Sequence, residues 1–135
     1  MSGDFKIVIT GGAGLVGQNL IHRLTKRGYR RIVAIDKHPA NTATLARLNP
    51  AAEIIEADLA EGGKWEEAFA GAHALVLNHA QIGGTDEKPF LDNNVTATAN
   101  VIAAARANGV GNLIHVSSSV VNSLARDYYT ESKKA

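Results

Sequence analysis

Apolar and polar positions along the chain alternate between two kinds of segment. Five short runs are rich in β-branched and apolar residues, which is typical of strands; they span residues 5–10, 31–36, 53–58, 72–78 and 112–117. Longer stretches with helical spacing of apolar residues lie between these runs. Loops are expected at residues 62–63 and 83–89, where glycine, charge and proline interrupt the pattern.

Two of the longer stretches carry an apolar stripe at helical spacing. The stripes consist of Val16, Leu20 and Leu24 in the first stretch and of Val95, Ala99 and Ile102 in the second. The second stretch ends at Asn108-Gly109, a pair suited to a left-handed helix cap. Trp65 and Phe69, four residues apart, are expected to pack in the core from a further helix.

The predicted strands are continuously apolar rather than alternating, as expected when helices cover both faces of a parallel sheet. Five repeats of strand and helix therefore predict an α/β fold with a doubly wound, open parallel sheet. Ligands of such sheets bind outside the carboxyl ends of the strands. Functional residues are therefore expected at the strand ends.

The first strand end is rich in glycine. Gly11, Gly14 and Gly17 lie between a predicted strand and a predicted helix. The first glycine permits a tight turn, the second lets the backbone approach a diphosphate, and the third lets the helix pack closely. The start of the helix adds unpaired N–H groups and a partial positive charge. This context predicts a site for the pyrophosphate of a dinucleotide.

Acidic residues end the second and third strands. Asp36 stands 19 residues after Gly17, where a carboxylate can bind both adenosine ribose hydroxyls and repel a 2′-phosphate. NAD is therefore favoured over NADP, although the neighbouring Lys37 is a cation that can partly accommodate the phosphate. Asp36 can alternatively cap a turn. Asp58 can bond the adenine amino group or cap the segment that follows, and the sequence leaves both alternatives open.

The fifth strand ends in three serines, Ser117, Ser118 and Ser119, and a tyrosine and a lysine follow them. Tyr129 and Lys133 are four residues apart and share one face of a helix. The lysine ammonium favours the phenolate, which makes the tyrosine a usable general acid/base. A serine hydroxyl can polarise or position the substrate oxygen, and the lysine can also reach the nicotinamide ribose.

Composition narrows the range of partners. The 135 residues predict one domain, and a formal net charge of +1 gives no reason to expect nucleic acid or a membrane surface. The absence of cysteine excludes disulfides, thiolate zinc sites and a cysteine nucleophile, and the five histidines do not cluster, so no metal is expected. No targeting or spanning segment is visible, and a cytoplasmic location is expected.

Taken together and in this order, TGGAGLVG, Asp36, Asp58-Leu59, NNVTATANV, VSSS and YTESK resemble the short-chain dehydrogenase/reductase superfamily. The TGxxGxxG form is similar to its extended branch, the NAD-dependent epimerase/dehydratase family. The resemblance covers residues 5–133 and implies a Rossmann-like fold, NAD as the cofactor and a small-molecule substrate. Members of the branch commonly pair through their fourth and fifth helices, so a homodimer is the assembly that the resemblance implies.

The resemblance also assigns roles to residues. Those implied to contact the cofactor are Gly11, Gly14, Leu15, Val16, Gly17, Asp36, Asp58, Leu59, Asn78, His79, Ala80, Ser117, Tyr129 and Lys133. Those implied in catalysis are Ser119, with Ser118 as the alternative, Tyr129, Lys133 and Asn94, which helps to order the active site. We expect His79 to be a hydrogen-bonded wall residue rather than an additional acid/base.

The sequence departs from the family pattern in two places. Nine residues separate Ser119 from Tyr129, where relatives acting on nucleotide sugars carry a longer loop with a VYG-like turn. A smaller substrate, such as a sugar acid or another hydroxyacid, therefore has room. The chain also ends two residues after Lys133, so the remaining strands and the C-terminal substrate domain of the family are expected to be absent. Residues 1–135 are thus expected to be an incomplete NAD(P)-binding domain, truncated after about five strands, from a longer enzyme.

Three functions fit this sequence. The first is an NAD-dependent dehydrogenase, epimerase or dehydratase acting on a sugar, sugar acid or nucleotide sugar, with Tyr129 as acid/base. The second is a fragment or regulatory module that binds the cofactor without turnover. The third is an interaction fragment whose exposed sheet edge pairs with another chain. The serines and the Tyr129–Lys133 pair favour the first function for the longer enzyme.

Overall fold

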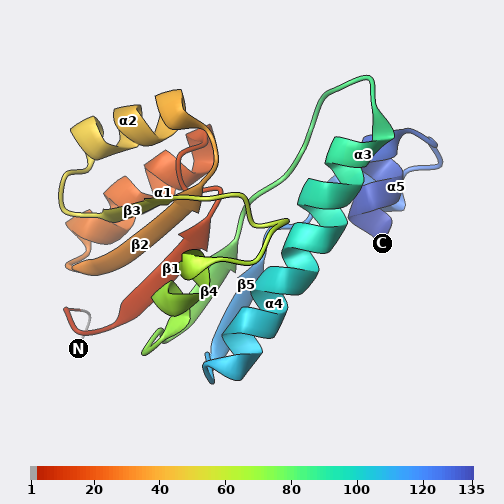
Figure 1. The fold of residues 1–135 in the computed structure, drawn as a ribbon. Helices are drawn as coiled ribbons and strands as arrows, with labels where there is room; N and C mark the ends of the chain where they lie inside the picture. Colours follow the sequence, from red (N-terminus) through yellow and green to blue (C-terminus); the bar gives the residue numbers. More distant parts are fainter. Residues whose placement is uncertain (1–2) are drawn as a thin grey trace.

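A computed structural model describes residues 3–135, which form one parallel sheet with helices on both faces (Figure 1). The strands are β1 (Lys6–Thr10), β2 (Arg31–Asp36), β3 (Glu53–Glu56), β4 (Ala74–Leu77) and β5 (Asn112–His115). Their order is β3-β2-β1-β4-β5, and every neighbouring pair is parallel. The predicted doubly wound, Rossmann-like α/β fold is therefore confirmed, with each strand within two residues of its expected bounds.

The helical elements cover both faces of the sheet, apart from the last two, which lie beyond it. The elements are α1 (Leu15–Lys26), α2 (Pro39–Leu48), the 3-10 helix η1 (Lys64–Phe69), α3 (Glu87–Phe90), the π-helical η2 (Leu91–Thr96), α4 (Ala97–Ala107), the 3-10 helix η3 (Ser119–Asn122) and α5 (Tyr128–Lys134). α3, η2 and α4 form one continuous rod along the sheet (Figure 1). None of the helices in residues 3–135 is long and apolar enough to cross a membrane.

The core consists of two apolar clusters, one on each face of the sheet. On one face Ile9 of β1 packs with Ile21 of α1 and Leu45 of α2. On the other face, Val8 packs with Phe69 of η1 and Val101 of α4. Adjacent residues of β1 thus point into different clusters, which explains why the strand is apolar at consecutive positions.

Trp65 and Phe69 pack in the core as predicted. Both rings are buried and meet edge to face, with their centroids 5.9 Å apart. The element that carries them is a 3-10 helix in the connection between β3 and β4. The left-handed cap is also confirmed, since Gly109 has a φ of 66° at the end of α4.

The predicted stripes of the two long helices hold in part. In α1, Leu20 and Leu24 pack against the core as predicted, but Val16 is exposed at the start of the helix, and Ile21 is fully buried. In α4, Ile102 packs against the core, whereas Ala99 is exposed. The buried residues of α4 are Ala97, Val101, Ala104 and Ala105, and the three alanines let the helix lie close to the sheet.

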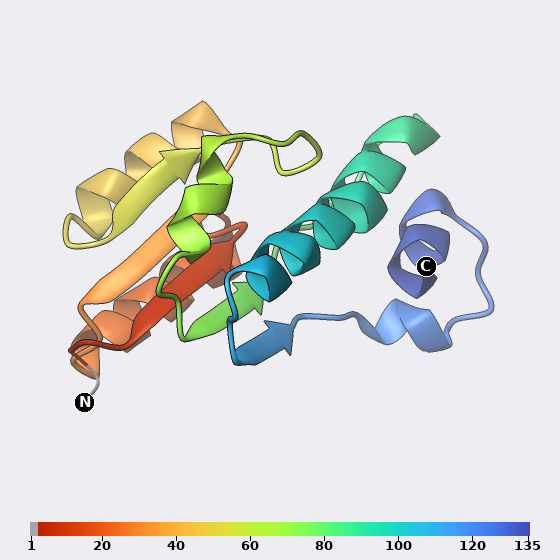
Figure 2. The ribbon, with the colours of Figure 1, turned by 60° about the horizontal axis from the view of Figure 1, so that its bottom comes forward.

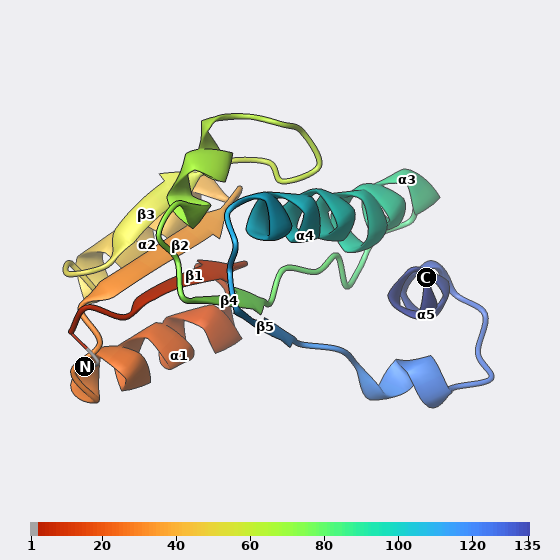
Figure 3. The ribbon, with the colours of Figure 1, turned by 90° about the horizontal axis from the view of Figure 1, so that it is seen from below.

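β5 is covered far less than the strands before it. All four of its residues are exposed. Beyond β5 the chain runs away from the sheet through η3, and α5 lies past the end of α3 rather than over the sheet (Figures 2 and 3). α5 is held there partly by a contact between the rings of Tyr128 and Phe90, whose centroids are 5.8 Å apart.

Candidate functional site

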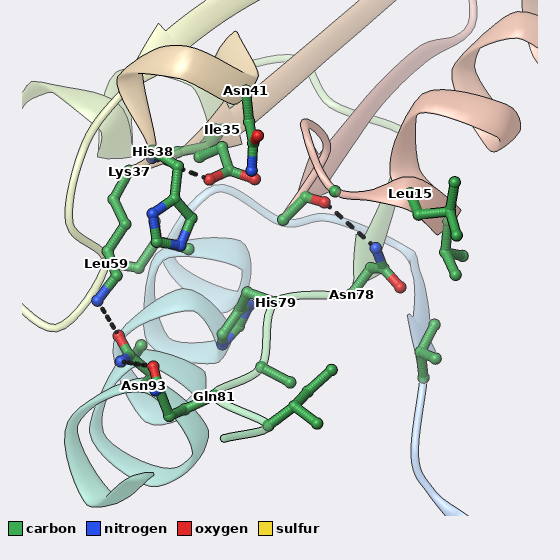
Figure 4. A pocket seen from close by; sticks show the side chains of 18 of the residues that line it. Leu15, Ile35, Lys37, His38, Asn41, Leu59, Asn78, His79, Gln81 and Asn93 are labelled. Carbon is green, nitrogen blue, oxygen red and sulfur yellow. Dashed lines mark hydrogen bonds between the residues drawn. The ribbon is translucent and has the colours of Figure 1, made fainter. Parts of the chain in front are cut away.

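A cavity of about 520 Å³ opens at the carboxyl ends of the strands (Figure 4). Predicted cofactor residues that line it are Gly11, Gly14, Leu15, Val16, Asp36, Leu59, Asn78, His79, Ala80, Ser117, Tyr129 and Lys133. Gly17 and Asp58 are not among the lining residues. The topology therefore brings the glycine turn, the end of β2, the end of β4 and α5 to one cavity, as expected from the reversal of strand order between β1 and β4.

The three glycines of the turn have different structural roles. Gly11 has a φ of 62°, and a Cβ there would lie 2.7 Å from the Cα of His79. At Gly17 a Cβ would lie 2.6 Å from the backbone of Gly12, so this glycine lets α1 pack against the turn. Gly14 has only an ordinary contact, at 3.5 Å, and lines the cavity. The turn is thus closed by its outer glycines and open to a ligand at the middle one.

The start of α1 faces the cavity without a side-chain cap. Gly14 is the N-cap residue, and the first turn of the helix contains no acidic residue. Leu15 and Val16 of that turn line the cavity. First-turn N–H groups and the positive end of the helix dipole can therefore bind a diphosphate, so this part of the site fits the pyrophosphate of a dinucleotide.

Asp36 is a buried carboxylate on the cavity wall. One of its oxygens accepts from the N–H of Ala13 at 3.1 Å, and the other accepts from the N–H of His38 at 3.1 Å. The side chain therefore caps a turn and lines the cavity at the same time, so the two roles considered for it coexist. Its negative charge lies next to the glycine turn, where an adenosine ribose would be bound.

Asp58 and Leu59 separate in the structure. Asp58 is exposed, and its carboxylate accepts from the N–H of Ala60 at 3.0 Å. Of the two roles left open for Asp58, the structure contains the capping one. Leu59 is buried and lines the cavity, so an adenine ring at this end would contact its apolar side chain.

His79 is a hydrogen-bonded wall residue, as expected. Its Nδ1 lies 2.7 Å from the hydroxyl of Thr10, and its Nε2 lies 3.1 Å from the hydroxyl of Thr98. Burial first, and then the positive charges of Lys133 and His115, lower the pKa of His79 to about 4. The imidazole is therefore neutral at neutral pH and joins β1, β4 and α4 through one ring.

Asn94 orders the site from behind the cavity wall. Its Oδ1 accepts from the N–H of Gln81 at 2.7 Å, and its Nδ2 donates to the carbonyl of Gln81 at 3.0 Å. The same Nδ2 donates to the hydroxyl of Ser132 on α5 at 2.9 Å. Asn94 thus joins the loop after β4 to the helix that carries Tyr129 and Lys133, an arrangement that supports the predicted ordering role.

The serine run is only partly placed at the cavity. Ser117 lines it together with Tyr129 and Lys133, and the ammonium of Lys133 donates to the carbonyl of Val116 at 3.4 Å. Ser119 is exposed and does not line the cavity. Because the Ser118 hydroxyl caps η3, the chain turns into that helix immediately and carries Ser119 away from the cavity.

Four polar lining residues were not predicted from the sequence: His38, Asn41, Gln81 and Asn93. Gln81 lies on the loop after β4, and Asn93 is a buried residue of η2. Their side chains are hydrogen-bonded to each other, with Asn93 Nδ2 donating to Gln81 Oε1 at 3.2 Å. The sequence offered one signal for Asn93 and Gln81, which is that each is adjacent to a predicted site residue, Asn94 and Ala80 respectively.

Comparisons with known proteins agree with this geometry. The model of the NAD dependent epimerase/dehydratase family matches residues 7–133. The 2-alkyl-3-oxoalkanoate reductase of Stenotrophomonas maltophilia is 34% identical over 113 residues, which are 83% of this chain and 33% of the reductase. A UDP-glucose 4-epimerase of Klebsiella pneumoniae is 30% identical over 127 residues, which are 86% of this chain and 91% of that protein.

Solved structures show the same fold. The Bordetella bronchiseptica enzyme WbmG in complex with NAD superposes with a TM-score of 0.83 at 25% identity. The match covers 95% of this chain and 46% of WbmG, so the chain spans less than half of that enzyme and a third of the reductase. The family model accounts for nearly the whole sequence, and the chain therefore belongs to the NAD dependent epimerase/dehydratase family.

Proposed function

We propose that the chain binds NAD in this cavity as the cofactor-binding part of an NAD-dependent oxidoreductase, epimerase or dehydratase. One observation carries the proposal. The cavity is lined at one end by Gly14 and Asp36, which suit a dinucleotide, and at the other by Tyr129 and Lys133, which suit proton transfer. In this proposal residues 1–135 form an incomplete domain, and the part that binds the rest of the substrate lies elsewhere.

The residues present fit the adenosine and pyrophosphate parts of NAD. The first-turn N–H groups of α1 would hold the pyrophosphate, and Asp36 would accept hydrogen bonds from the adenosine ribose. Leu59 would form an apolar wall beside the adenine. The negative charge of Asp36 favours NAD over NADP, and the complex of WbmG with NAD supports the same choice.

When bound, NAD supplies an acceptor for a hydride from a carbinol carbon of the substrate. Tyr129, as phenolate, takes the hydroxyl proton on its phenolic oxygen, and the Lys133 ammonium stabilises that form. Ser117 presents the serine hydroxyl that lines the cavity, while a role for Ser119 stays a prediction. Asn94 keeps α5 in place through its bond to Ser132.

We propose a sugar, sugar acid or nucleotide sugar as the substrate. The Klebsiella pneumoniae relative is named a UDP-glucose 4-epimerase, which supports the sugar classes. The Stenotrophomonas maltophilia relative is named a 2-alkyl-3-oxoalkanoate reductase, and the short segment between Ser119 and Tyr129 also favours a smaller molecule. The homodimer and the cytoplasmic location stay predictions.

A second candidate function is cofactor binding without turnover. The exposed position of Ser119 and the uncovered strand β5 favour it, because the walls around a substrate are sparse at that end. The two functions differ in whether hydride transfer follows binding, and they can be separated with the same protein.

Calorimetric titration of the chain with NAD and with NADP tests the proposal. We expect saturable binding of NAD that is tighter than binding of NADP. Gly14→Val should weaken binding, because its side chain would occupy the cavity at the diphosphate position, whereas Gly83→Val, in open space on a loop, should not. Absence of saturable binding of either dinucleotide would overturn the proposal.

Turnover is tested by NADH formation with a panel of sugars and hydroxyacids. Activity that is lost in Tyr129→Phe while NAD binding is retained would support the enzyme. Binding of NAD without NADH formation from any of these compounds would favour the second function.

A further inference from the structure

Lys37, the lysine that follows Asp36, is hydrogen-bonded to a residue of another part of the cavity wall. The ammonium of Lys37 donates to Oδ1 of Asn93 at 2.8 Å, and Asn93 in turn donates to Gln81 (Figure 4). All four side chains line the same cavity. This chain of bonds joins the end of β2 to η2 and to the loop after β4, across 56 residues of sequence between Lys37 and Asn93.

Asn93 is well placed to fix that ammonium. It is buried, and its amide is oriented by the bond to Gln81, so that Oδ1 is the atom turned towards Lys37. A hydrogen bond from an ammonium is stronger than one between neutral groups. The lysine stem is flexible, and this bond selects one of its many rotamers.

The hydrogen-bond partners of Asp36 do not include the neighbouring Lys37. Both of its oxygens accept backbone N–H groups, from Ala13 and His38. A 2′-phosphate on the adenosine ribose would therefore meet a carboxylate, with the ammonium of Lys37 turned away towards η2. If Lys37 were released, its four-carbon stem would let the ammonium approach that phosphate and offset the repulsion.

We infer that Asn93 sets the preference for NAD over NADP by holding Lys37 away from the adenosine ribose. Asn93 is thus a specificity-determining residue that acts through Lys37. The inference rests on the proposed function, because it concerns how the same cavity distinguishes two dinucleotides. It also explains how a lysine can follow Asp36 directly without making the site favour NADP.

The test compares the ratio of the dissociation constants for NADP and NAD in four proteins. These are the wild-type chain, Asn93→Ala, Lys37→Met and the double variant. In Asn93→Ala the ratio should fall about fivefold, the effect expected of one partly exposed ion pair. The double variant should have the same ratio as Lys37→Met, because no ammonium remains to be released. Asn19→Ala, on the exposed side of α1, is the matched control and should leave the ratio unchanged.

Two results would overturn the inference while NAD binding by the wild type stands. One is a ratio in Asn93→Ala within twofold of the wild-type ratio. The other is an equal fall when Asn93→Ala is made in the Lys37→Met background, which would assign the effect to the loop bonded through Gln81. If Asn93→Ala fails to fold, Asn93→Asp decides, since a carboxylate would hold Lys37 more firmly and should raise the ratio. If the wild type binds neither dinucleotide, the proposed function and this inference fall together.

Discussion

The glycine-turn half of the molecule and the segment from β5 to α5 are built differently, although both line one cavity. Four of the five residues of β1 and five of the six residues of β2 are buried, whereas every residue of β5 is exposed. α1 packs against the sheet through Ile21, which is fully buried. α5, in contrast, has seven residues and lies beyond the end of the sheet (Figure 3).

The difference teaches how each part of the site is held in place. The diphosphate end is fixed by close backbone contacts, such as those around Gly11 and Gly17, and needs few side-chain bonds. The Tyr129 end depends on tethers: Asn94 to Ser132, Tyr128 to Phe90, and Lys133 to the carbonyl of Val116. We therefore expect the loss of a single side-chain hydrogen bond to change cofactor binding little. At the Tyr129 end, the loss of one hydrogen bond should be enough to displace the catalytic side chains.

The two edges of the sheet show the same contrast. β3 begins and ends with glutamate, and its two isoleucines are half-buried against the neighbouring clusters. β5 has no acidic residue, and its Leu113 and Ile114 are 46% and 55% exposed. Acidic residues protect the β3 edge from pairing with other strands, and β5 lacks that protection.

The largest predicted effect is on stability, from truncation of apolar side chains in the two regions. Leu75 of β4 is fully buried, so Leu75→Ala should lower the free energy of unfolding by about 3 kcal/mol. Ile114→Ala in β5 should change it by less than about 0.5 kcal/mol, because that side chain is already exposed. Urea denaturation followed by circular dichroism measures both values. A cost at Ile114 as large as that at Leu75 would break the comparison, because it would mean that β5 is covered in solution.

The next effect is a dependence of stability on pH, and it comes from His79, which lies between the two regions. The pKa of His79 is about 4 in the folded chain and 6.5 for an ordinary histidine, so only the unfolded chain binds this proton between those values. Stability from this group is therefore complete above pH 6.5 and is lost as the pH falls to 4, by up to about 3 kcal/mol. The difference in unfolding free energy between the wild type and His79→Gln, measured from pH 7 to pH 4, should shrink accordingly.

The same histidine reports whether the α5 segment stays at the cavity. The charge of Lys133 is the second cause of the lowered pKa of His79, after burial. Lys133→Met should therefore raise the pKa of His79, measured by NMR titration of its ring protons, without restoring it to 6.5. An unchanged pKa in Lys133→Met would show that the segment lies farther from the cavity than the structure has it.

Glycine substitutions test how the glycine-turn half is packed, and the larger of them should lower the free energy of unfolding by about 1–3 kcal/mol. Gly17→Ala should destabilise by that amount, because its Cβ would lie 2.6 Å from the backbone of Gly12. Gly14→Ala should cost only about 0.5–1 kcal/mol, as expected of alanine at an N-cap, because its Cβ has ordinary contacts. Thermal unfolding of the two variants measures the difference. Equal costs would mean that the turn is not closed by the packing of α1.

The sequence predicted the glycine-turn half well. In the segment from β5 to α5 it predicted that Ser117, Tyr129 and Lys133 line the cavity, but not the course of the chain between them. Strand bounds, the glycine turn and the position of Asp36 follow from short-range rules of apolar runs and tight turns. The displacement of Ser119 does not, because it depends on the Ser118 hydroxyl capping η3 and on how little covers β5. Asn93 was missed because its partner Lys37 is 56 residues away in the sequence, and no local pattern predicts such a bond.

The smallest predicted effect is local and concerns the tether between η2 and α5. Ser132→Ala removes the hydroxyl that accepts from Asn94, so it should lower global stability by about 1 kcal/mol or less. Hydrogen exchange should rise in α5 alone, because Asn94 keeps its two bonds to Gln81. Ser123→Ala, in the loop before α5, is the matched control and should leave exchange in α5 as it is. Faster exchange across β1 and β2 in Ser132→Ala would show that the two regions unfold as one, and the division between a rigid cofactor end and a tethered catalytic end would then be wrong.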